Sequence, residues 1–195
     1  MAAKRTYPYR SNTYPAKRLK YLETAVKRNR PEMQFKTTHL NTAVGVIATG
    51  IPGFVTESLT PIAQGNGKTT RSGNKIRVWR VEVRGFLSPQ LNLSLIQSHG
   101  PNTPVVGSFT GRYLMNDLTN TRFTEWKYYN NMNASDEAND YSPCRFVQKF
   151  SKGMIVKFPG SSIYPDDNGL HLCCNNFSAD IGTVDVSIRV WFTDE

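Results

Sequence analysis

The chain has 195 residues, of which 38% are hydrophobic and 11% aromatic, and its formal net charge is +9. This composition excludes an intrinsically disordered chain, and the length is that of one globular domain with room for a hydrophobic core. The 11 prolines and 14 glycines indicate many turns between short elements, which favours β structure.

The positive charge is concentrated at the start of the chain, in a basic arm of residues 1–36. The arm has ten basic and two acidic side chains, a net charge of +8, whereas residues 37–195 have fourteen basic and thirteen acidic side chains. A basic block beside an almost neutral domain is typical of an arm that binds a polyanion, and a solubilising tail is the alternative. The ten residues that we predict to bind nucleic acid are Lys4, Arg5, Arg10, Lys17, Arg18, Lys20, Lys27, Arg28, Arg30 and Lys36.

A short amphipathic helix is predicted within the arm, over residues 16–29. Leu19, Leu22 and Val26 recur at three- and four-residue spacing, and the other faces are basic. A helix of this length is marginal alone in water, so we expect it to need nucleic acid or neighbouring subunits for full order. Three tyrosines ahead of it alternate with cations and prolines, which suits stacking on the bases of a single strand, with a disordered tail as the alternative. The tyrosines are Tyr7, Tyr9 and Tyr14.

No membrane partner is expected. The longest apolar region, residues 43–55, is interrupted by three glycines and a proline and is too short to span a bilayer. The first residues have no apolar stretch behind their charges, so a secretory signal is not expected either. The sequence therefore predicts a soluble protein.

The segment QGNGKTTRSGNKIRVWRVEVRG, residues 64–85, begins like a phosphate-binding loop. A GxxxxGK[ST] loop ending at Thr69 needs glycine where Ile62 stands, and a helix must follow it so that its amides face the phosphates. Residues 75–84 alternate like a strand instead, with a change of parity after Val78 that indicates a bulge. The sequence therefore predicts a turn that leads into a strand.

This segment carries a second group of basic residues, with Glu82 as its one acid. A nucleic-acid-binding surface and a solvent-facing edge that deters aggregation both fit such a group. The basic residues are Lys68, Arg71, Lys75, Arg77, Arg80 and Arg84, of which Lys75, Arg77 and Arg80 are assigned to nucleic-acid binding.

Further strands are predicted because apolar residues recur at every second position. The clearest is the last, where nine alternating residues, 184–192, indicate a strand with one buried face. No stretch after residue 36 has a helical period, which argues against a parallel βαβ sheet and favours an antiparallel sandwich or barrel. The other predicted strands cover residues 91–95, 121–129, 154–158 and 170–174.

The three cysteines, Cys144, Cys173 and Cys174, form no CxxC pair and no cluster with zinc spacing. An odd number also fits poorly with a secreted disulfide scaffold. We predict that they are small buried apolar residues of an intracellular product.

We expect no enzyme, no metal and no cofactor. The sequence has no GxSxG, HExxH or zinc-deaminase signature. Its scattered histidines are expected to be structural or surface residues, and its acidic clusters lack the spacing of a calcium loop and are expected to be solvated turns. The histidines are His39, His99 and His171, and the acidic clusters are Asp136, Glu137 and Asp140, and Asp166 and Asp167.

The sequence resembles the capsid proteins of circular single-stranded DNA viruses that encode their own replication initiator, the circovirus-like group. The passage LTPIAQGNGKTTRSGNKIRVWRVEVRG, residues 59–85, is similar to that group's passage from a loop into the first barrel strand. LIQSHGPNTP at 95–104, NDLTNTRF at 116–123 and the ending RVWFTDE resemble later strands in the same order. The arm is shorter and less rich in arginine than circovirus arms, and an arm with a basic helix is also similar to that of the satellite necrosis virus coat protein, which packages RNA.

The resemblance implies a viral capsid protein. Residues 37–195 would form a single eight-stranded antiparallel jelly roll, and 60 copies would assemble into a T=1 icosahedral shell with the arm inside against the genome. It favours circular single-stranded DNA over RNA as the packaged partner, and it implies a location in the virion and, during assembly, in the host nucleus. The alternative is a single-stranded nucleic-acid-binding β-barrel module that forms no shell.

Part of the arm is spaced like a two-part nuclear import signal, so host nuclear import receptors are further expected partners. Any genome-binding arm would contain similar clusters. The residues of this signal are Lys17, Arg18, Lys27, Arg28 and Arg30.

Overall fold

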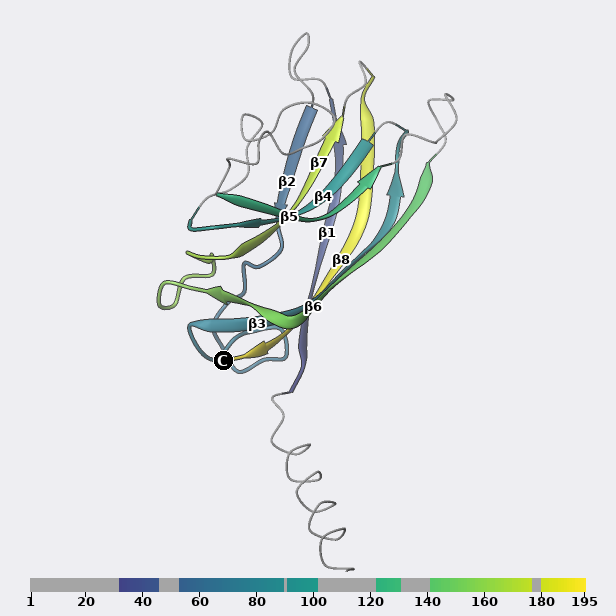
Figure 1. The fold of residues 1–195 in the computed structure, drawn as a ribbon. Coiled ribbons are helices and arrows are strands. Elements are labelled where there is room, and N and C mark those ends of the chain that lie inside the picture. Colours follow the sequence, from purple (N-terminus) through teal and green to yellow (C-terminus); the bar gives the residue numbers. More distant parts are fainter. Residues whose placement is uncertain (1–31, 46–52, 90, 102–121, 131–140, 177–179) are drawn as a thin grey trace, which may run out of the picture. The chain divides into compact units, whose positions relative to one another are not determined.

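The computed structural model describes residues 32–45, 53–89, 91–101, 122–130, 141–176 and 180–195 (Figure 1). These residues form eight strands. The strands are β1 (Gln34–Val44), β2 (Gly53–Ser58), β3 (Lys75–Leu87), β4 (Leu91–Ser98), β5 (Phe123–Asn130), β6 (Ser142–Lys157), β7 (Gly169–Asn176) and β8 (Gly182–Asp194).

The strands make two four-stranded sheets, in the orders β1-β8-β3-β6 and β2-β7-β4-β5. All strand pairs within them are antiparallel. Each sheet takes strands from both halves of the chain, so that β1 pairs with β8 and β2 pairs with β7, as in a jelly roll. The predicted fold class, an all-β eight-stranded jelly roll, is confirmed.

The core lies between the two sheets and is built from rows of alternate residues. In β8 the residues that alternate in the sequence are buried, which confirms the prediction of one buried face. Burying such a row contributes roughly 1.5–3 kcal/mol for each large apolar side chain. The row consists of Val184, Val186, Ile188, Val190 and Phe192.

Strand β3 contains the predicted bulge. Its pairing with both β6 and β8 shifts register between Val78 and Arg80. The shift allows Ile76 and Val78 on one side of the bulge, and Val81 on the other, to face the same core although their parity differs.

The residues ahead of β3 form a turn and not the start of a helix. The Gly67 amide donates to the Thr70 hydroxyl oxygen at 2.7 Å, and the Thr70 amide donates to the Gly67 carbonyl at 3.1 Å. The Gly65 amide donates to the carbonyl of Arg71 at 2.8 Å, which closes the loop. The interpretation of GNGK as a turn leading into a strand is confirmed.

Other boundaries differ from those in the sequence analysis. Strand β1 begins at Gln34, so residues 34–36, which the sequence placed in the arm, lie in a sheet. Strand β4 is buried on both faces, polar positions included, although alternation predicts one solvated face.

The predicted helix over residues 16–29 lies outside the described residues. Among the described residues, no helix has the length and apolar character needed to cross a bilayer.

Candidate nucleic-acid interface

The face of the β1-β8-β3-β6 sheet that points away from the core carries arginines from three neighbouring strands. Arg80 and Arg84 lie on β3, Arg145 on β6 and Arg189 on β8. Arg84 is directly opposite Arg145 across the strand pair. We call this surface the arginine face. It consists of Phe35, Arg80, Glu82, Arg84, Arg145, Arg189 and Trp191.

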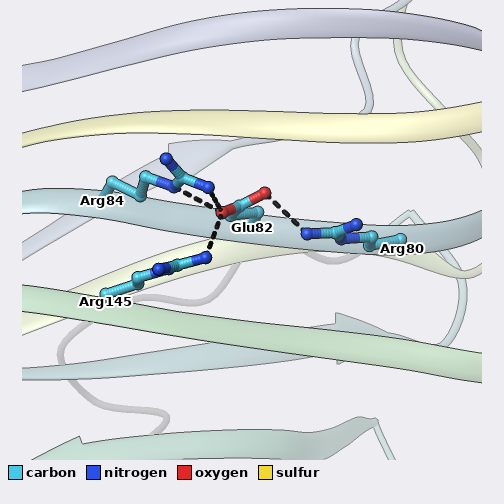
Figure 2. A network of polar contacts seen from close by, with 4 residues as sticks. All are labelled: Arg80, Glu82, Arg84 and Arg145. Atoms are coloured by element: carbon cyan, nitrogen blue, oxygen red, sulfur yellow. Dashed lines mark hydrogen bonds and ion pairs between the residues drawn. The ribbon is translucent and has the colours of Figure 1, made fainter.

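Glu82 lies buried at the centre of the arginine face (Figure 2). Its Oε2 accepts a hydrogen bond from Arg80 Nη2 at 2.8 Å. Its Oε1 accepts a hydrogen bond from Arg84 and lies 3.6 Å from Arg145 Nη2. Arg80, Glu82 and Arg84 lie on one side of β3 because they are two residues apart along the strand. The antiparallel pairing of β3 with β6 brings Arg145 to the same side.

The electrostatics of this cluster favour an ionised Glu82. Burial alone would raise the pKa of its carboxyl group, but the hydrogen bond and charge of Arg84, with the charges of Arg80 and Arg145, hold that pKa below its usual value. One carboxylate therefore orders three guanidinium groups. Because each guanidinium has five N–H donors, these contacts leave donors for other partners.

Aromatic rings separate the arginines along this face. The Arg80 guanidinium lies 4.6 Å from the centroid of the Trp191 ring. Arg189 lies 5.6 Å from the same centroid and 5.2 Å from that of Phe35. Each exposed cation–π contact stabilises by about 0.5–1 kcal/mol, and together these contacts hold the cations against the rings.

A hollow of about 110 Å³ opens on the arginine face. It is lined by Glu82, Arg84, Ser187 and Arg189. Arg84 is directly opposite Ser187 in the pairing of β3 with β8, and Glu82 is directly opposite Arg189. Two guanidinium groups and a hydroxyl group at one opening are donors suited to an anion.

The residues assigned to nucleic-acid binding from the sequence differ in their surroundings. Lys75 is exposed at the start of β3, whereas Arg77 pairs with Glu195 and donates to the Lys152 carbonyl at 3.0 Å. Arg80 belongs to the Glu82 cluster. Of the other ten assigned residues, nine lie in residues 1–31, outside the described residues, and the tenth is Lys36.

Lys36 is a special case, because its ammonium group donates to the Pro61 carbonyl at 2.7 Å. Burial lowers the pKa of Lys36, and the charge of Glu57 opposes that shift. The contact joins β1 to the loop after β2, which gives this side chain a structural role in the sheet.

Arg71, a member of the second basic group, is fully buried. Its guanidinium lies 4.1 Å from the centroid of the Phe158 ring and donates to four backbone carbonyls. Burial lowers the pKa of Arg71 and the charge of Asp194 opposes that shift. Arg71 therefore joins two loops and is not available to a ligand. The acceptor residues are Ile62, Gly73, Gly160 and Ser162.

Several residues of the arginine face were not identified from the sequence. Arg189 and Trp191 are the outward residues of the strand whose inward row was predicted, so the same alternation contained the signal for them. Phe35 is opposite Trp191 on β1, a pairing across most of the chain that no local pattern indicates. Arg145 likewise joins the face only through the pairing of β6 with β3.

Aromatic rings are also found on the other sheet. Trp126 on β5 is exposed, and its indole Nε1 donates to Gln97 Oε1 at 2.8 Å. Its ring contacts Phe150 edge to face, with centroids 5.0 Å apart. An open hollow of about 490 Å³ lies beside it. Partly exposed rings on both sheets are the feature expected of a module that binds single strands.

The cysteines and two of the histidines, His99 and His171, lie apart from this surface. His39 does not, because it lies on the same side of β1 as Phe35 and directly opposite Ser187. Cys144, Cys173 and Cys174 are buried free thiols, as predicted, and burial raises the pKa of Cys144 to about 11 and that of Cys173 to about 12. Burial lowers the pKa of His171 to about 4, and its ring lies 3.2 Å from the Ser98 hydroxyl. His39 is exposed beside Asp185.

The described residues contain no group of three or more His, Cys, Asp or Glu side chains able to hold a metal ion. Asp167 pairs with Lys157 at 3.1 Å. The acidic cluster of Asp136, Glu137 and Asp140 lies outside the described residues.

No model of a known protein family matches the sequence, and no curated protein matches it. The solved structures that match this chain include two of the BFDV capsid protein. The decameric form is 7% identical, covers 84% of this chain and 98% of that chain, and has a TM-score of 0.39. The 60-mer is 9% identical, covers 84% of this chain and 93% of that chain, and has a TM-score of 0.37. A structure of infectious bursal disease virus, Gx strain, is 12% identical, covers 85% of this chain and 32% of that chain, and has a TM-score of 0.34.

Proposed function

We propose that this protein is a viral capsid protein that assembles into a closed shell and packages a single-stranded genome. The observation that carries this proposal is that nearly all of the net positive charge lies in the arm and not in the folded domain. A basic arm precedes a jelly roll whose residues 37–195 are almost neutral. Jelly rolls occur in viral capsids, lectins and cupins, and the arm is what favours the first of these.

In the proposed mechanism the jelly roll meets identical copies of itself and the arm neutralises packaged phosphates. Shell formation is thereby coupled to the amount of genome bound. Binding through lysine and arginine contacts to phosphates is tolerant of sequence and weakens steeply with salt. The role is structural, and no catalytic step is required for it.

The finer features of the proposal follow from the resemblance to circovirus-like capsid proteins. The shell would contain 60 copies in a T=1 arrangement, and the genome would be circular single-stranded DNA in preference to RNA. The protein would act in the virion and, during assembly, in the host nucleus.

Nuclear entry would use import receptors that recognise the paired basic clusters. Residues 1–36 fused to a fluorescent protein should then accumulate in nuclei. The same fusion with Lys17, Arg18, Lys27, Arg28 and Arg30 replaced by glutamine should not. An even distribution of the unmodified fusion through the cell would contradict import by this segment.

A second candidate function is a single-stranded nucleic-acid-binding module that never forms a shell. The exposed ring of Trp126 and the partly exposed ring of Trp191 favour it, because bases stack on such rings. Both functions predict binding to single strands, so self-assembly is the property that separates them.

The mass of the purified protein in low salt, measured by light scattering with the ultraviolet absorbance ratio of the same peak, tests the proposal. With a chain mass of 22.0 kDa, 60 copies give about 1.3 MDa before any packaged nucleic acid is added. We expect a particle of this size, with an absorbance ratio raised by nucleic acid. A monomer or dimer that persists after single-stranded DNA or RNA is added would overturn the capsid proposal and favour the binding module.

A further inference from the structure

Positive charge is segregated within the jelly roll as well as along the chain. The arginine face carries four guanidinium groups against the Glu82 carboxylate, although residues 37–195 as a whole have only one more basic than acidic side chain. Asp185, two residues before Ser187 on the same side of β8, lies 3.9 Å from His39. The arginines lie on one side of one sheet, on β3 and on the strands β6 and β8, which both pair with β3 from Arg80 onward. A rigid cationic surface of this kind is a binding surface for a polyanion.

Arg189 is the cation of this face that is most available. Within the described residues it forms no ion pair, and its guanidinium lies over the rings of Phe35 and Trp191. It is exposed and lines the hollow described above. The rings fix its direction without neutralising its charge.

The hollow has the composition of a phosphate site. Arg84 and Arg189 supply guanidinium donors and Ser187 supplies a hydroxyl donor. The Glu82 carboxylate on its wall is already engaged by arginines, so its negative charge is locally outweighed. A phosphodiester, with one negative charge and two free oxygens, can accept from both guanidinium groups.

The rings beside the hollow suit bases. Phe35 is 43% exposed and lies directly opposite Trp191 across the pairing of β1 with β8. Aromatic rings interleaved with cations are the arrangement that binds single strands without sequence preference, because the bases stack on the rings while the cations hold the backbone.

We propose that the arginine face binds single-stranded nucleic acid itself, as a second site beside the basic arm. A phosphodiester sits in the hollow between Arg84 and Arg189, and neighbouring bases stack on Phe35 and Trp191. The inference rests on the proposed function and deepens it, because packaged strands would then be held by an ordered surface of the jelly roll. A second copy of the chain is the less favoured occupant, because two arginine faces would repel each other.

Photo-cross-linking of the full chain to an oligothymidine containing 5-iodouracil, followed by mass spectrometry, tests the location. We expect adducts at Phe35 or Trp191 in addition to any adducts in residues 1–31. Adducts confined to residues 1–31 would overturn the inference. If the same preparation still forms particles containing nucleic acid, the proposed function stands without it.

Binding measurements on full-length variants test the contacts. The pair Arg84→Gln and Arg189→Gln should reduce the slope of log affinity against log salt by about 1.4, which corresponds to two phosphates on a single strand. The matched pair Lys68→Gln and Lys127→Gln, which removes two exposed charges elsewhere, should leave the slope unchanged. Equal slopes for the two pairs would overturn the inference.

Phe35→Ala provides a variant that leaves Glu82 and its arginines in place. Loss of one stacking ring should weaken binding of the oligothymidine by about tenfold. Unchanged affinity would contradict stacking at this position. If the arginine pair instead abolishes particle formation while the unassembled protein binds DNA normally, the face is a contact between copies and the inference is wrong.

Discussion

Deletion of residues 1–31 is expected to reduce the salt slope of nucleic-acid binding by about 6, and with it the affinity by several orders of magnitude. The segment carries nine basic side chains, and each phosphate contacted on a single strand contributes about 0.7 to the slope. The deletion ends before Gln34 because that residue begins β1, and because Lys36 donates to the Pro61 carbonyl. A deletion to residue 36 would damage the sheet and confound the result.

An arm without basic side chains is the matched control for this deletion. Replacing the nine basic residues by glutamine keeps the length, the tyrosines and the apolar positions, so it isolates charge from stacking. We expect this variant to lose almost as much of the salt slope as the deletion. A deletion that leaves the affinity and the slope unchanged would eliminate the arm as a binding element, and the arginine face would then carry the binding alone. The replaced residues are Lys4, Arg5, Arg10, Lys17, Arg18, Lys20, Lys27, Arg28 and Arg30.

Arg71→Met is expected to lower the free energy of unfolding by about 4 kcal/mol. Four backbone carbonyls lose their donor, and a buried polar group left without a partner costs about 1–3 kcal/mol, with part of the loss recovered by rearrangement or water. Methionine fills much of the space above Phe158, so the effect isolates the donors. The whole free energy of unfolding of a native domain is only about 5–15 kcal/mol, so the yield of folded protein should fall sharply.

Denaturant unfolding followed by tryptophan fluorescence gives the measurement. Lys68→Met changes an exposed residue of the same loop and should stay within about 0.5 kcal/mol of the unmodified protein. The free energy of unfolding of Arg71→Lys should lie between those of Arg71→Met and Lys68→Met. One ammonium group cannot reach all four carbonyls to which the planar guanidinium donates. If Arg71→Met and Lys68→Met have equal effects, Arg71 does not hold these loops together.

Much of the fold could be predicted from the sequence because its strands carry their burial pattern locally. The alternation over residues 184–192 and the parity change after Val78 both reappear in the structure as a buried row and a bulge. The burial of strand β4 was not predicted correctly, because Asn92 and Ser94 are buried although their polarity predicts exposure. Strands β1 and β2 have no strict apolar alternation and were not predicted as strands.

The candidate site was predicted only in part. Composition identified Arg77 and Arg80 as basic residues of a strand, but it could not distinguish Arg71, whose donors are all satisfied inside the protein, from Arg84 on the surface. Arg189 was not identified, because its surroundings depend on rings from its own strand and from β1.

The sequence by itself determined the separation of a basic arm from an almost neutral domain, the all-β class and the row of β8 that faces the core. Each of these depends on composition or on residues two positions apart. The tertiary structure alone decided which cations are buried, which are paired and which remain available. The reason is that β1, β8, β3 and β6 are neighbours in the sheet but distant in the chain, and only their pairing places Phe35, Glu82, Arg145 and Arg189 on one surface.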